Sequence, residues 1–63
     1  MKREALIREL RKLARERGVE FVVIEGRGKG SHYRVKFGNR RTIIKSGELT
    51  PTYVMQVRKQ LGV

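Results

Sequence analysis

The chain has 63 residues, no cysteine, and 16 lysines and arginines against six acidic residues, which give a formal net charge of +10. A chain of this length forms one small domain, expected over residues 1–63, without disulfides to stabilise it. One histidine and scattered carboxylates argue against a metal site, and no cofactor is expected. No apolar run reaches the roughly 20 residues that span a bilayer, and no signal-peptide pattern is present, so we expect a cytoplasmic protein.

The first part of the chain predicts a helix followed by a strand. Residues 3 to 17 place Leu6, Leu10 and Leu13 on one helical stripe, which is typical of an amphipathic helix. Gly18 is a suitable stop signal just past the last turn. The segment from Val19 to Ile24 is rich in β-branched residues and predicts a strand.

The middle of the chain predicts a β-hairpin. His32 to Phe37 alternates between polar and apolar residues, which indicates a strand with one buried face. Gly38-Asn39 suits a two-residue hairpin turn. Arg41 to Lys45 is the return strand, and Ser46 to Glu48 forms the loop after it.

A second helix is expected after Thr50, an N-cap residue, with Pro51 in the first helical position and Gly62 at the end. The order is therefore helix, three-stranded meander, helix. This pattern predicts an α+β fold, α-β-β-β-α, with a three-stranded antiparallel sheet and both helices packed on one of its faces.

The alternation of the second strand assigns its two faces. Its apolar residues face the helices, and its polar residues share the opposite side. A two-residue turn sets Phe37 opposite Arg40, and counting outward predicts further pairs: Lys36 with Arg41, Arg34 with Ile43, and His32 with Lys45. One exposed face of the sheet should therefore gather His32, Arg34, Lys36, Arg41 and Lys45.

Positive charge is concentrated in the same region. From Gly26 to Lys45 there are seven basic residues and no acidic one, and a phosphate backbone is the natural complement of such a block. The glycine-rich turn either lets backbone amides approach a phosphate or serves only as a flexible hairpin turn. The candidate RNA-binding residues are Arg27, Lys29, Gly30, Ser31, Arg34, Lys36, Arg41 and Lys45.

His32, the only histidine, is the candidate catalytic residue. RNA carries its own nucleophile, the 2′-hydroxyl, so cleavage of its backbone needs only proton transfer and stabilisation of developing charge. An imidazole accepts or donates a proton near neutral pH, and neighbouring lysines and arginines stabilise the phosphoryl oxygens. The alternative is that His32 is an ordinary surface residue.

Gly30-Ser31-His32 at the start of a strand resembles the glycine-serine-histidine signature of HicA-type toxins, the mRNA interferases of bacterial toxin–antitoxin pairs. The similarity continues through Ser46-Gly47-Glu48-Leu49 and Lys59-Gln60-Leu61-Gly62. The resemblance implies a fold like the double-stranded RNA-binding domain, a catalytic role for His32, and a HicB-type antitoxin that covers the active surface. Many members have a proline and another histidine after the third strand, where this chain has Ile43-Ile44-Lys45-Ser46.

Two functions remain open. The first is a metal-independent endoribonuclease toxin that acts on mRNA through His32 and is monomeric when free of its antitoxin. The second is a non-catalytic RNA-binding module of the same fold, although the final helix begins Thr50-Pro51-Thr52-Tyr53 and lacks the lysine cluster expected there. A structural ribosome-associated protein would fit the charge but gives His32 no role. No membrane partner is expected.

Overall fold

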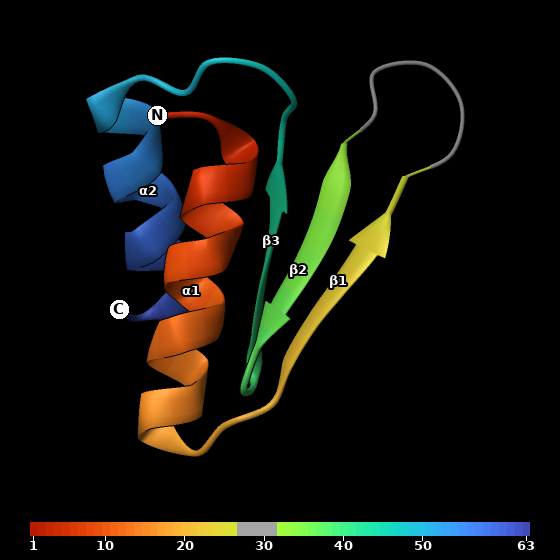
Figure 1. The fold of residues 1–63 in the computed structure, drawn as a ribbon, viewed down its shortest axis with the longest axis vertical. Helices are drawn as coiled ribbons and strands as arrows, with labels where there is room; N and C mark the ends of the chain where they lie inside the picture. The colour runs from red at the N-terminus through yellow and green to blue at the C-terminus, as the bar shows by residue number, and fades with distance from the viewer. Residues whose placement is uncertain (27–31) are drawn as a thin grey trace.

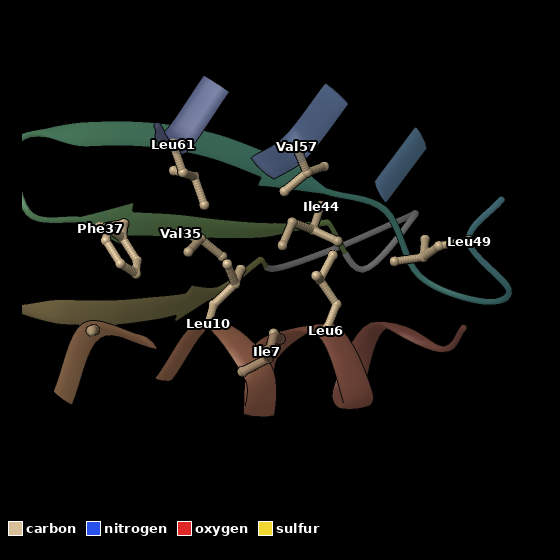
Figure 2. Close-up of a cluster of buried hydrophobic side chains, with 10 residues drawn as sticks. Leu6, Ile7, Leu10, Val35, Phe37, Ile44, Leu49, Val57 and Leu61 are labelled. Carbon is tan, nitrogen blue, oxygen red and sulfur yellow. The ribbon is translucent and has the colours of Figure 1, made fainter. Parts of the chain in front are cut away.

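The computed structural model describes residues 1–26 and 32–63. Its elements are α1 (Arg3–Arg17), β1 (Phe21–Glu25), β2 (Tyr33–Phe37), β3 (Arg40–Ile44) and α2 (Pro51–Leu61). The strands form one antiparallel sheet in the order β1-β2-β3, and α1 and α2 pack on the same face of it (Figures 1 and 2). The predicted α+β class and order of elements are confirmed.

The two helices begin and end where the sequence predicts. Gly18 closes α1 in the left-handed conformation with φ 67°, a region in which a residue with a Cβ is strained. Thr50 caps α2, because its Oγ1 accepts a hydrogen bond of 3.2 Å from the backbone N–H of Tyr53. Neither helix in the described part of the chain is long and apolar enough to cross a bilayer.

All three strands differ from the predicted ranges at their ends. β1 begins at Phe21 and not at Val19, because the Val19 N–H donates to the carbonyl of Ala14 and belongs to the end of α1. β3 begins at Arg40, which pairs with Phe37 across the two-residue turn. It ends before Lys45, whose N–H donates to the hydroxyl of Tyr53.

The core lies between the helices and one face of the sheet (Figure 2). On the predicted stripe of the first helix, Leu6 and Leu10 are buried and Leu13 is half-buried. In α2, Val57 is buried, whereas Val54, like Tyr33 of β2, is half-buried at the margin. The complete buried apolar set is Leu6, Ile7, Leu10, Ala14, Val35, Phe37, Ile44, Leu49, Val57 and Leu61. Burial of these side chains is the main favourable contribution to folding.

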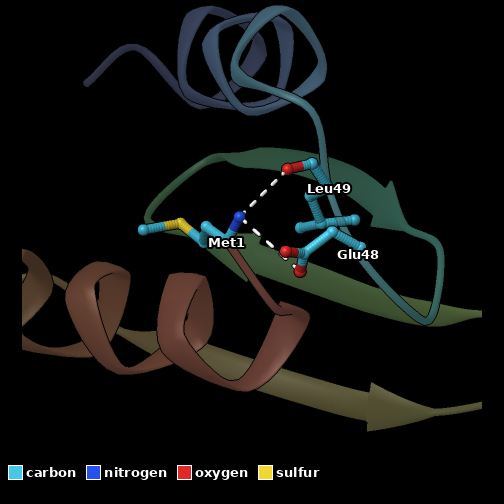
Figure 3. Close-up of polar contacts among 3 residues, drawn as sticks. All are labelled: Met1, Glu48 and Leu49. Atoms are coloured by element: carbon cyan, nitrogen blue, oxygen red, sulfur yellow. Dashed lines mark hydrogen bonds and ion pairs between the residues drawn. The ribbon is translucent and has the colours of Figure 1, made fainter.

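The loop between β3 and α2 is fastened to the start of the chain (Figure 3). The Met1 amine donates to the carbonyl of Leu49 at 3.1 Å and lies 3.7 Å from a carboxylate oxygen of Glu48. In return, the Leu49 N–H donates to the Met1 carbonyl at 2.7 Å. These contacts hold the Leu49 side chain in the core, although it comes from outside every helix and strand.

Candidate nucleic-acid interface

The sheet face that points away from the helices consists of two rows of cross-strand neighbours. Ile24 of β1, Arg34 of β2 and Ile43 of β3 form the first row. Val22, Lys36 and Arg41 form the second row. We call this surface the open face; its residues are Val22, Ile24, Arg34, Lys36, Arg41 and Ile43. The predicted pairs of Arg34 with Ile43 and of Lys36 with Arg41 are confirmed.

The open face combines positive charge with exposed aliphatic groups. Arg34 and Arg41 are exposed, and Ile24 and Ile43 keep 57% and 54% of their surface accessible. An open hollow of about 800 Å³ lies over the face, and its lining also includes Val35, Thr42 and, from α2, Gln60. Because none of the six open-face residues is acidic, the hollow suits an anionic ligand that also has an apolar part.

Lys36 is the one open-face cation with a carboxylate partner in the described part of the chain. Its Nζ lies 3.3 Å from Oε1 of Glu20, which precedes β1. The Lys36 side chain is 43% exposed and that of Glu20 66%, so the pair contributes little to stability. The carboxylate nevertheless competes with a phosphate for this ammonium group.

His32 is exposed and comes immediately before β2. The ladder between β2 and β3 stops at Tyr33 and Ile44, one pair short of the predicted pair of His32 with Lys45. The Lys45 ammonium lies 4.8 Å from the ring centroid of Tyr53, so a cation–π contact draws this side chain toward α2. Lys45 is therefore beside the open face and not opposite His32 in the ladder.

Gly26 lies closely against the backbone of His32. A Cβ at Gly26 would collide with the carbonyl oxygen of His32. The close approach requires glycine, since the obstructing atom belongs to the backbone and has no rotamer to change. A residue with a Cβ at position 26 would therefore displace the backbone of His32, which directly precedes β2.

Four of the candidate RNA-binding residues, Arg27, Lys29, Gly30 and Ser31, lie outside the described residues. Arg40, which belongs to the same basic block, lies on the helix side of the sheet beside Gly62. The Tyr33 ring also faces the helices, with the Arg3 guanidinium 3.5 Å from its centroid, which leaves it unsuited to stacking on a base.

The sequence did not reveal the apolar part of the open face. β1 reads Phe-Val-Val-Ile-Glu, so both of its faces are apolar and alternation does not show that Val22 and Ile24 point outward. Their side is set by pairing with Lys36 and Arg34. Ile43 could have been found, because its predicted partner Arg34 already places it on the exposed side.

The open face offers cations that can bind phosphate, and the neighbouring His32 offers an imidazole that can carry a proton. Among residues 1–26 and 32–63 there is no group of three or more histidine, cysteine or acidic side chains that could hold a metal ion.

Comparison of the chain with protein-family models, curated proteins and solved structures found no significant match. The functional argument therefore depends on the residues themselves.

Proposed function

We propose that the protein is a metal-independent endoribonuclease, an mRNA interferase of the HicA type, with His32 as its general acid and base. One observation carries the proposal. An exposed imidazole, that of His32, directly precedes β2, and the open-face side chains of this strand, Arg34 and Lys36, are both cationic. This arrangement combines a proton carrier with groups that bind a phosphate backbone.

In the proposed reaction the ribose 2′-oxygen attacks the adjacent phosphorus, and the bond from phosphorus to the 5′-oxygen breaks. Neutral His32 accepts the proton of the 2′-hydroxyl, and the resulting imidazolium donates a proton to the departing 5′-oxygen. The products are a 2′,3′-cyclic phosphate and a 5′-hydroxyl. Arg34 supplies positive charge near the phosphoryl oxygens as negative charge develops on them.

The biological setting follows from this activity. A nuclease that acts on mRNA works in the cytoplasm and harms the cell unless it is held in check. We propose a HicB-type antitoxin as the inhibitor, in keeping with the resemblance at Gly30-Ser31-His32. The uncovered sheet face is a suitable surface for an inhibitor to occupy, and the toxin released from it is proposed to be a monomer.

A second candidate is a non-catalytic RNA-binding module. It is favoured by the open face itself, which carries three cations but neither a carboxylate nor an imidazole that could act together with His32. An enzyme with separate acid and base groups would need one of these. RNA binding without cleavage requires only the cations.

Induced expression of the chain beside His32→Ala distinguishes the two functions. The original chain should arrest growth and deplete cellular mRNA, whereas His32→Ala should do neither and still bind RNA. Gln56→Ala, at an exposed position on α2, is the matched control and should act like the original chain. Equal growth arrest by the His32 variant, or arrest without loss of mRNA, contradicts the catalytic role.

A further inference from the structure

The first row of the open face places a planar cation between two exposed aliphatic side chains. Arg34 pairs with Ile24 on one side and with Ile43 on the other. Both isoleucines expose more than half of their surface, in a chain whose other open-face charges are also positive. Phosphate binding explains Arg34 but not its two apolar neighbours.

Unpaired nucleobases have flat faces that match both the arginine and the aliphatic side chains of this row. Bases splayed out of a single strand stack on the plane of an arginine guanidinium, and apolar side chains pack against their faces. In a duplex those faces are already stacked on neighbouring base pairs, and a protein meets mainly phosphates and hydroxyls. Two outward isoleucines would have little to contact on a duplex.

We propose that Ile24, Arg34 and Ile43 form a seat for one unpaired nucleobase, so that RNA is single-stranded where it crosses the open face. The inference deepens the proposed function, because it takes RNA as the ligand, but it does not require cleavage. In this arrangement Arg41 and Lys36 of the second row contact the phosphates that flank the seated base. His32 lies on the other side of the seat, directly before the first residue of β2.

Charge favours a nucleic acid over a protein as the occupant of this seat. Arg34 separates the two isoleucines, and Lys36 and Arg41 border them in the next row. The aliphatic surface is therefore divided by cations, and one of them, Lys36, is of a residue type that is typically depleted from protein interfaces. A ligand with flat apolar faces joined by phosphates matches the alternation directly.

The test compares three RNA ligands in the His32→Ala background, which prevents cleavage. The ligands are a single-stranded oligonucleotide, the same strand with abasic riboses throughout, and a perfect duplex, each measured by fluorescence anisotropy. Ile43→Ser should weaken binding of the normal single strand by about fivefold, a modest share of what base stacking contributes elsewhere. It should not change binding of the abasic strand or of the duplex.

Two further variants make the result specific. Arg34→Lys keeps the charge but loses the planar group, so it should weaken binding of the normal strand and leave binding of the abasic strand unchanged. Met55→Ser is the matched control, because Met55 is 69% exposed on α2, away from the sheet face, and its loss should leave all three affinities unchanged. Circular dichroism confirms that each variant remains folded.

Several outcomes would overturn the base seat. If the Ile43→Ser variant binds the normal strand as tightly as its parent, with or without a loss of antitoxin binding, the isoleucine does not touch a base. An equal loss of affinity for the normal and the abasic strand would lead to the same conclusion. The proposed catalysis fails separately: if the original chain discriminates normal from abasic strands but never cleaves RNA, the seat stands and the nuclease does not.

Discussion

Replacement of Arg34, Lys36 and Arg41 by glutamine removes three positive charges from the open face without touching the core. The matched control replaces three exposed cations on α1, Arg8, Lys12 and Arg15, by glutamine. Both triple variants lose the same share of the net charge of +10. A difference between them therefore reports where RNA binds and not how basic the protein is.

The size of the effect follows from counterion release. Each phosphate contact on a single strand contributes about 0.7 to the slope of log affinity against log salt concentration. Arg41 should supply one contact and Lys36 a second, for which the Glu20 carboxylate competes at 3.3 Å, whereas Arg34 faces the seated base. The open-face variant should thus lose about 0.7 to 1.4 of the slope, so that the difference in affinity between the variant and its parent shrinks roughly 3- to 7-fold between 50 and 200 mM salt.

The assay is a salt titration of binding to a single-stranded oligonucleotide in the His32→Ala background. The α1 variant should keep the slope of its parent within experimental error, because its altered residues lie on the opposite side of the molecule from the open face. A reduced slope in the α1 variant with an unchanged slope in the open-face variant would refute the assignment. RNA would then bind across the helices.

Four single substitutions test other parts of the structure. Leu10→Ala should lower the free energy of unfolding by about 2–5 kcal/mol in urea titrations, because the side chain is fully buried between α1 and the sheet. Thr50→Ala should cost about 1 kcal/mol through loss of the N-cap bond, and unchanged stability would contradict that role. Glu20→Gln should increase RNA affinity by releasing Lys36; a decrease would show that the ion pair positions the lysine usefully. Gly26→Ala should slow RNA cleavage more than it weakens RNA binding, since the added Cβ displaces the His32 backbone, and equal effects would count against a positioning role.

Local signals were sufficient for the fold. Gly18, the Thr50-Pro51 pair and the two-residue turn each act on the backbone nearby, and each sits where the structure needs it. The register of β2 with β3 followed from that turn alone, because a hairpin fixes pairing outward from its loop. Strand ends were harder to predict, since they depend on distant groups such as the Tyr53 hydroxyl, which accepts a hydrogen bond from the N–H of Lys45.

The candidate site was only partly predictable for the same reason. Arg34, Lys36 and Arg41 follow from alternation along a strand with one buried face. The outward side of Ile24 depends on pairing with β2, and the burial of Leu49 depends on contacts with Met1. Both are long-range effects that no local pattern in the sequence encodes.

The most direct test of the central claim is the cleavage of a labelled single-stranded RNA by the purified protein in excess EDTA, beside His32→Ala. The account predicts fragments with 2′,3′-cyclic phosphate and 5′-hydroxyl ends from the original chain and intact RNA with the variant. Replacement of the ribose at the cut site by 2′-deoxyribose should also prevent cleavage, because it removes the nucleophile. Equal cleavage by the His32 variant, or cleavage at a 2′-deoxy position, would contradict the account.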